Sequence, residues 1–146
     1  MAKFKFRLES YLGLKEKLED RKKQEYGKAL AALEREKAEE ARLRRAGKEN
    51  LDEFRKSLEM QIEPAVLRSY NDFSELIKKR IDAQAKAVRM AEAEAERKRL
   101  ELVEAVKEKK ALEILKGKAR EEFRLEEKLA EQKTVDEIVS YRFKRT

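Results

Sequence analysis

The sequence predicts an all-α fold in which two long helices form an antiparallel coiled-coil hairpin. Of the 146 residues, 47% are charged and only 7% are aromatic, which is poor material for an ordinary globular core. Ala, Glu, Lys, Leu and Arg dominate the composition, and all five are strong helix formers. Pro64 is the only proline, and it separates two stretches of helical pattern. These observations favour two extended helices paired along a narrow seam.

The first helix is expected to run from about residue 4 to about residue 61. Apolar residues recur there at intervals of three and four, the spacing of a coiled coil. Gly13, Gly27 and Gly47 lie inside this stretch, and each costs about 1 kcal/mol relative to alanine. Because none of them is followed by turn residues, we expect the helix to continue through all three. The apolar stripe is formed by Leu8, Tyr11, Leu14, Leu18, Tyr26, Leu30, Leu33, Leu51, Phe54, Leu58 and Ile62.

The second helix is expected to run from about residue 66 to about residue 142. Proline is tolerated in a first helical turn but not in a helix interior, and it biases the preceding Glu63 away from helical geometry. The turn should therefore fall near residues 61–65. A connection this short makes the two helices antiparallel neighbours. We expect a single coiled-coil domain over residues 1–146.

The position of the turn predicts how the two helices face each other. A fold centre near residues 63 and 64 pairs Phe54 with Phe73 and Phe4 with residue 123. The middle of the first helix then faces an alanine-rich part of the second, where we expect the thinnest and most flexible seam. Everything beyond about residue 124 is left without a partner, an overhang of roughly 30 Å at 1.5 Å per residue.

The composition excludes several kinds of chemistry. With no Cys and no His, the chain has no thiolate, no imidazole and no zinc site of the common kinds. No acidic cluster has the spacing of a calcium-binding loop, and the 31 acidic residues are expected on solvated helix faces. We therefore expect no enzymatic activity, no cofactor and no metal.

Charge and hydropathy limit the partners and the location. Residues 1–10 contain no apolar run of secretory length, and no segment approaches the roughly 20 apolar residues of a membrane span. We expect a cytoplasmic protein without membrane insertion. The formal net charge of +7 raises the question of nucleic acid, but basic and acidic residues are interspersed almost everywhere. Nucleic acid is therefore not the expected partner.

The two ends of the chain carry the most specific patterns. The alternation in Phe4-Lys5-Phe6-Arg7-Leu8 fits either a short strand or, as we favour, a helix onset. At the other end, Leu129, Val135, Ile138, Val139 and Phe143 form an apolar stripe on the overhang. This stripe is open to two interpretations, a frayed tail or second seam, and a binding site for another protein.

Together these ends resemble the FliJ family, a soluble component of the flagellar type III protein export apparatus. The match at the start consists of Phe4, Phe6, Leu8, Leu12, Leu14 and Lys15. At the end it consists of Gln132, Lys133, Asp136, Glu137, Ile138, Arg142 and Phe143. Val135 departs from the pattern, since a bulkier apolar residue is expected there. The architecture is similar over the whole length, whereas the motifs are specific only at the termini.

The resemblance implies a coiled coil similar to the central stalk of rotary ATPases. Its paired termini would sit in the hexamer of the flagellar export ATPase, and its other end would meet FlhA, the export gate in the membrane. Export chaperones are further candidate partners, and the chain is expected to be monomeric when free. The location implied is the cytoplasmic face of the inner membrane at the flagellar base. The implied ATPase-binding residues are Phe4, Phe6, Leu8, Gln132, Val135, Ile138, Val139, Arg142 and Phe143.

Aromatic residues gather beside the predicted turn. Phe54, Tyr70, Phe73 and Ile77 are most simply coiled-coil core, yet a seam normally frays beside a turn, and a partly exposed aromatic patch suits a contact with the export gate. Two functions therefore stay open for the whole chain. One is a non-enzymatic export component that couples the ATPase to the gate. The alternative is a self-associating or nucleic-acid-binding structural coiled coil.

Overall fold

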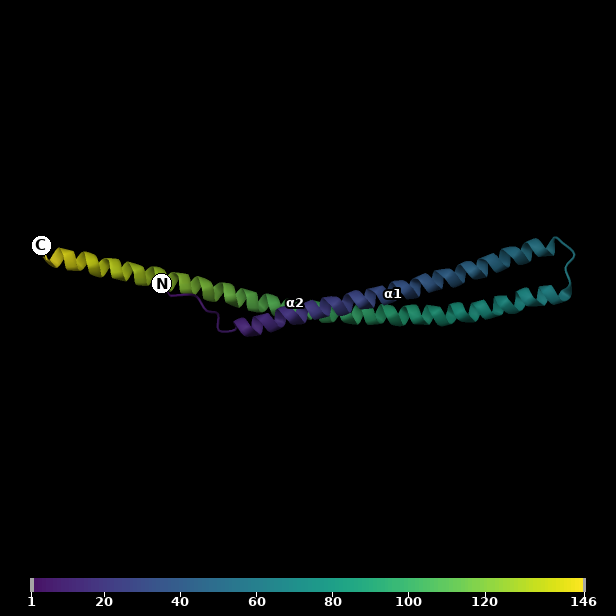
Figure 1. Cartoon of the computed structure of the whole chain (residues 1–146), viewed down its shortest axis with the longest axis horizontal. Coiled ribbons are helices and arrows are strands. Elements are labelled where there is room, and N and C mark those ends of the chain that lie inside the picture. The colour runs from purple at the N-terminus through teal and green to yellow at the C-terminus, as the bar shows by residue number, and fades with distance from the viewer. Residues whose placement is uncertain (1, 146) are drawn as a thin grey trace. The chain divides into compact units, whose positions relative to one another are not determined.

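The fold consists of two long helices that pack against each other, as the sequence predicts. The computed structural model describes residues 2–145. Helix α1 spans Glu9–Leu58 and helix α2 spans Pro64–Arg145, so the second helix is the longer one (Figure 1). No strand occurs within these described residues. The prediction of an all-α antiparallel pair with unequal helices is confirmed.

The loop between the helices lies where proline chemistry places it. Pro64 is the first residue of α2, a position where its missing N–H costs nothing. The carbonyl of Glu63 accepts hydrogen bonds from the amides of Val66 at 3.0 Å and Leu67 at 3.4 Å. Helix α1 ends at Leu58, three residues earlier than expected. The loop is therefore centred on Gln61 and not on residues 63 and 64.

The chain before α1 is not helical, contrary to the favoured expectation of a helix from residue 4. Residues 2–6 have no regular secondary structure, and a turn at residues 7 and 8 leads into α1. Phe4, Phe6 and Leu8 are partly buried, while the basic residues between them are exposed. A period of two suits an extended chain laid on a surface, because alternate side chains then point to opposite sides. We call residues 2–8 the N-terminal arm.

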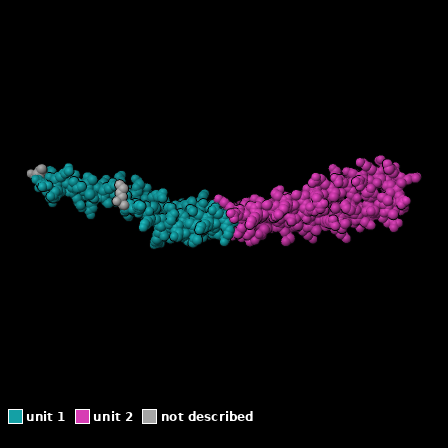
Figure 2. All heavy atoms as spheres, in the orientation of Figure 1, with its two compact units in different colours: residues 1–21, 103–146 teal, residues 22–102 magenta. Residues whose placement is uncertain are grey.

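The chain divides into two compact units, which are coloured separately in Figure 2. Unit 1 contains the residues up to Arg21 together with those from Val103 onward. Unit 2 contains residues Lys22–Leu102 and includes the loop. Each unit pairs a section of α1 with a section of α2.

The side chains that are buried in the seam of unit 2 are apolar. Its buried side chains are Leu33, Leu43, Ile77, Val88 and Ala95. Leu33, Val88 and Ala95 form one cluster, against which Ala29 and Ala91 pack. This cluster lies in the alanine-rich section, where we expected the thinnest seam. Small side chains let two helices approach closely, so the alanines here contribute to a buried core.

The seam of unit 1 contains a buried charged side chain beside apolar ones, which the apolar pattern did not predict. Its buried apolar residues are Leu12, Ala105 and Leu112. Glu19 is only 5% exposed, and its Oε2 lies 2.6 Å from Nζ of Lys109. The expectation that all acidic residues lie on solvated faces is therefore wrong for Glu19. Tyr11 and Leu14, which were expected in the stripe, are exposed.

The register near the loop differs from the expected one by about one helical turn. Phe54 meets Tyr70, with ring centroids 5.8 Å apart, in place of the expected Phe73. The reason is the shorter helix α1, which moves the centre of the loop toward the N-terminus. At the other end of the pairing, Phe4 meets Phe123, the position that the sequence predicted for it.

The helices are too polar to cross a bilayer. Across residues 2–145, none of the helical segments combines the length and the apolar content of a membrane span.

Candidate functional site

The last part of α2 extends beyond the pairing. Every residue of α2 after Glu127 is exposed, up to its end at Arg145. Large apolar side chains are among them: Leu129 is 65% exposed and Phe143 is 83% exposed. We call residues 128–145 the overhang. It contains all six C-terminal residues that the resemblance assigned to ATPase binding, and it leaves their side chains accessible.

The overhang carries apolar residues along two lines. The first line continues the seam of α2, which includes Leu112, Ala119 and Phe123. At the same intervals of three and four residues it passes through Ala130, Thr134, Ile138 and Tyr141. A second line follows the same spacing and contains Leu129, Gln132, Val139 and Phe143. Because two residues correspond to about 200° around a helix, lines offset by two residues lie on nearly opposite sides. Val135 and Arg142 flank the second line.

Polar groups on the overhang are partly satisfied within the helix itself. The hydroxyl of Thr134 donates a hydrogen bond to the carbonyl of Ala130 at 3.0 Å. The guanidinium of Arg145 lies 6.0 Å from the ring centre of Tyr141. A shallow groove of about 480 Å³ runs past Ala130, Thr134 and Val135 and is bordered by Glu127 and Glu131. The surface offered by this helix is thus apolar with a charged border.

The N-terminal arm lies against α2 just before the overhang. The ring centroids of Phe4 and Phe123 are 5.6 Å apart, and the guanidinium of Arg120 lies 5.6 Å from the centroid of the Phe4 ring. A groove of about 590 Å³ is lined by the arm and by residues of α2 that include Leu115, Phe123, Glu122 and Glu126. The arm covers the same side of α2 that α1 covers nearer to the loop.

The arm and the overhang residues of the resemblance do not form one cluster. Phe4 contacts Phe123, whereas Gln132 is nine residues further along α2, about 14 Å at 1.5 Å per residue. The structure therefore brings Phe4, Phe6 and Leu8 to the start of the overhang. The other six assigned residues, from Gln132 to Phe143, lie beyond them on the exposed helix.

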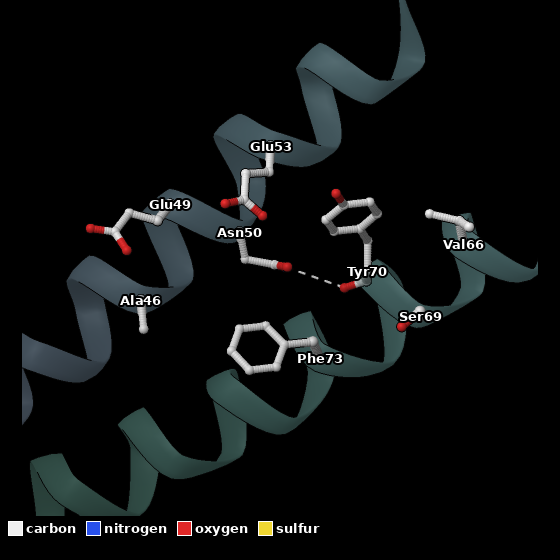
Figure 3. A pocket seen from close by; sticks show the side chains of 8 residues that line it. All are labelled: Ala46, Glu49, Asn50, Glu53, Val66, Ser69, Tyr70 and Phe73. Atoms are coloured by element: carbon white, nitrogen blue, oxygen red, sulfur yellow. Dashed lines mark hydrogen bonds between the residues drawn. The ribbon is translucent and has the colours of Figure 1, made fainter. Parts of the chain in front are cut away.

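Near the loop, aromatic side chains line a groove between the two helices (Figure 3). The groove has a volume of about 540 Å³, and Tyr70 and Phe73 of α2 face Ala46 and Asn50 of α1 across it. The side-chain amide of Asn50 donates a hydrogen bond to the carbonyl of Tyr70 at 3.2 Å. Glu49 and Glu53 stand on the α1 side. This is an aromatic groove with an acidic border.

The four aromatic and aliphatic residues expected at the gate contact differ in accessibility. Phe73 is 39% exposed, and Phe54 and Tyr70 are partly buried. Ile77 is only 5% exposed, because its side chain fills the space above Gly47. A side chain so placed supports the seam, and a partner could reach it only if the helices separated. Phe73 is the accessible member of the set.

Sequence reasoning missed several residues at both places. Ala130 and Thr134 are small and Tyr141 carries a hydroxyl, so a pattern of large aliphatic residues does not include them. Continuing the seam spacing past Phe123 would have found them. Asn50, Glu49 and Glu53 were overlooked because a hydrophobic pattern gives no weight to polar residues at seam positions.

The carboxylates do not gather into a metal site. Among residues 2–145, no group of three or more acidic side chains is arranged to hold a metal ion.

Comparison with known proteins identifies the family. The model of the family described as "Flagellar FliJ protein" matches residues 4–146. Among solved structures, the YscO homologue CT670 from Chlamydia trachomatis has a similar fold, with a TM-score of 0.60, 20% sequence identity and 93% of each chain covered. A search of curated protein sequences finds no significant match. The chain belongs to the FliJ family, whose members are components of the flagellar export apparatus rather than enzymes.

Proposed function

We propose that this protein is a non-enzymatic export component that binds the flagellar export ATPase hexamer and links it to the export gate protein FlhA. The overhang and the N-terminal arm would engage the ATPase in the manner of a rotary ATPase central stalk. The groove beside the loop would meet FlhA. This work would take place on the cytoplasmic face of the inner membrane at the flagellar base, with export chaperones as further candidate partners.

The observation that carries the proposal is the overhang with its two apolar lines. A single amphipathic stripe would fit a groove on one side of a helix. Apolar side chains on opposite sides of the same exposed helix suit a partner that surrounds it, as the ring of a hexamer does. Exposed apolar surface of this extent on a soluble chain marks an interaction site.

The charge at the chain ends supports the same partner. Lys3, Lys5 and Arg7 alternate with the apolar residues of the arm, and Arg142, Lys144 and Arg145 lie in the last turn of α2. Acidic residues are sparse at both places. Such charge would speed the approach to an acidic opening and make the association rate dependent on salt.

Truncation after Leu129 is the first test of the ATPase contact. It removes most of the overhang and leaves the paired sections intact, so we expect the purified chain to stay folded and to lose ATPase binding and stimulation. If the truncated chain binds and stimulates the ATPase as well as the full chain, the overhang is not the site.

Substitutions on the two lines give a sharper test. One variant carries Leu129→Ala, Val139→Ala and Phe143→Ala, and a second carries Ile138→Ala and Tyr141→Ala. A matched control carries Lys128→Ala, Glu131→Ala and Ser140→Ala, which are also exposed. An enclosing partner predicts weaker binding for both line variants and near-normal binding for the control. Loss in only one line variant would indicate a one-sided groove instead.

The gate contact is tested at Phe73. Because this side chain is partly exposed, Phe73→Ala should leave most of the thermal stability and weaken binding to the cytoplasmic part of FlhA. Ile77→Ala is the matched comparison, since it should lower the melting temperature strongly. A severe loss of stability in Phe73→Ala would show that the aromatic residues serve as core.

Self-association is the outcome that would favour the alternative function. Sedimentation of the free chain should give a monomer. A stable dimer whose affinity for DNA or RNA falls steeply with salt would favour a structural or nucleic-acid-binding coiled coil.

A further inference from the structure

Ion pairs between α1 and α2 gather in the part of the pairing that is far from the loop. In unit 2 they lie next in sequence to unit 1, where Nζ of Lys22 is 3.0 Å from Glu101 and Nζ of Lys98 is 3.3 Å from Glu25. Three pairs join α1 to α2 within unit 1. Nζ of Lys116 lies 2.8 Å from Glu9, Nζ of Lys15 lies 2.6 Å from Glu108, and Nζ of Lys109 lies 2.6 Å from Glu19. On the α1 side, the one buried apolar side chain of this unit among the described residues is Leu12.

Four of these six side chains occupy positions of the seam itself. Lys15 and Glu19 follow Leu12 at intervals of three and four, and Lys109 and Lys116 flank Leu112 at the same intervals. The side chains of Glu19 and Lys15 are 7% and 18% exposed. Pairing with Glu108 raises the pKa of Lys15, and pairing with Glu19 raises the pKa of Lys109, so both ammonium groups are held charged.

Charged layers stabilise a helix pair less than apolar layers do. Removing two charges from water raises the free energy of the folded state, and the attraction between them offsets this desolvation energy only in part. Polar residues at seam positions of coiled coils accordingly lower stability. In unit 2 the large side chains buried between the helices, Leu33, Leu43, Ile77 and Val88, are all apolar.

We propose that residues 9–21 of α1 form a releasable clasp, which separates from α2 while the apolar seam of unit 2 stays closed. Release would uncover Ala105 and Leu112 on α2. These residues lie on the seam line that continues into the overhang as Ala130, Thr134 and Ile138. The single-helix surface available to a partner would then grow by about 20 Å, at 1.5 Å per residue. The inference does not depend on which partner binds the overhang.

Hydrogen exchange of the full-length chain tests the clasp. In 0.05 M NaCl the amides of residues 12–21 should exchange faster than those of residues 33–43, since local opening needs less free energy there. In 1 M NaCl, where the Debye length falls to about 3 Å, exchange in residues 12–21 should rise about fivefold further. Exchange in residues 33–43 should change by less than about twofold over the same range, because no ionic layer comparable to that of unit 1 holds that section. Equal and salt-independent protection of both segments would overturn the proposal.

Replacing the charged layers should close the clasp. A variant with Lys15→Leu, Glu108→Leu, Glu19→Leu and Lys109→Leu converts two layers to apolar ones, so exchange in residues 12–21 should slow and lose its salt response. The matched control, Glu121→Ala with Arg124→Ala, removes an exposed ion pair on α2 of the same unit and should keep the salt response. A salt response that survives the leucine variant would contradict the proposal.

Reversing the charges of the Glu19–Lys109 pair tests the clasp without adding apolar side chains. Glu19→Lys alone places two ammonium groups together and should speed exchange in residues 12–21. Glu19→Lys combined with Lys109→Glu restores an ion pair of reversed orientation and should return exchange close to that of the native chain. If the single reversal leaves exchange unchanged, the pair does not hold the clasp.

Discussion

The ring centroid of Phe4 lies 5.6 Å from that of Phe123, with 54° between the ring planes. This tilted contact joins the N-terminal arm to α2 at the start of the overhang. Because the arm has no regular secondary structure of its own, its position depends on contacts of this kind. The pair therefore sets where the apolar residues of the arm stand relative to the exposed helix.

A double-mutant cycle measures this contact. Phe4→Ala and Phe123→Ala should each lower the free energy of unfolding, and the double variant should lose less than the sum of the two. Aromatic pairs contribute about 0.5–1.5 kcal/mol beyond area burial, which is the coupling expected here. Chemical denaturation followed by circular dichroism provides the values. Strict additivity would show that the two rings do not stabilise each other in solution.

The glycines within the helices should respond differently to alanine. Nothing lies within 4 Å of a β-carbon built at Gly117 or Gly27, so alanine there should stabilise the chain by about 0.5–1 kcal/mol through helix propensity. At Gly47 the added carbon would lie 3.3 Å from Cγ2 of Ile77, so alanine there should leave the stability unchanged or lower it. Thermal melts of the three single variants test the ranking. Equal stabilisation at all three positions would mean that the helices do not approach closely at Gly47.

The hydrogen bond from Asn50 to the Tyr70 carbonyl should matter for the end of the pair near the loop. Asn50→Ala removes the donor and should cost about 1 kcal/mol, the typical net value of such a bond. Asn50→Asp should cost more, because a carboxylate cannot donate and faces a carbonyl oxygen. Urea denaturation gives both values. If the aspartate variant proves as stable as the native chain, the bond is absent in solution.

Acid should weaken the pairing in unit 2 through two carboxylates. The hydrogen bond from Lys98 lowers the pKa of Glu25, and the hydrogen bond from Lys22 lowers that of Glu101, both from an ordinary value of 4.5. A carboxyl with a lowered pKa in the folded state contributes stability above its unfolded pKa and loses it as the pH falls through the folded pKa. The melting temperature should therefore decrease as the pH is lowered below about 4.5.

The control for the acid experiment is the double substitution Lys22→Gln and Lys98→Gln. It removes the cause of both lowered pKa values, so its melting temperature should be lower at pH 7 and should depend less on pH in the acid range. The same acid dependence in the control and the native chain would assign the effect to other carboxylates.

The fold could be read from the sequence because its signals are local. Pro64 marks the start of α2, and glycines without turn residues around them leave α1 unbroken. The family could be read from the termini because the motifs there are short and specific. The end of α1 at Leu58 was harder to place, since no residue in 59–63 forbids a helix, and the register near the loop shifted with it.

The charged residues in the seam of unit 1 were beyond an argument from apolar spacing. Glu19 and Lys109 look like solvent-facing residues in the sequence, and only their pairing at 2.6 Å makes them members of the seam. The arm was missed for a related reason. Alternation of Phe4, Lys5 and Phe6 fits several local conformations, and contact with Phe123 on α2 decides among them.

The continuity of the overhang with the rest of α2 has a consequence for how it folds. A helix of this length is marginal in water by itself, because nucleation fixes several residues for the first hydrogen bond. Here the preceding turns of α2 already supply the nucleus, and each further residue adds one bond for one residue ordered. A detached peptide of residues 128–145 should be mostly unfolded, whereas a protein that binds the overhang of the intact chain would meet a helix that is already formed.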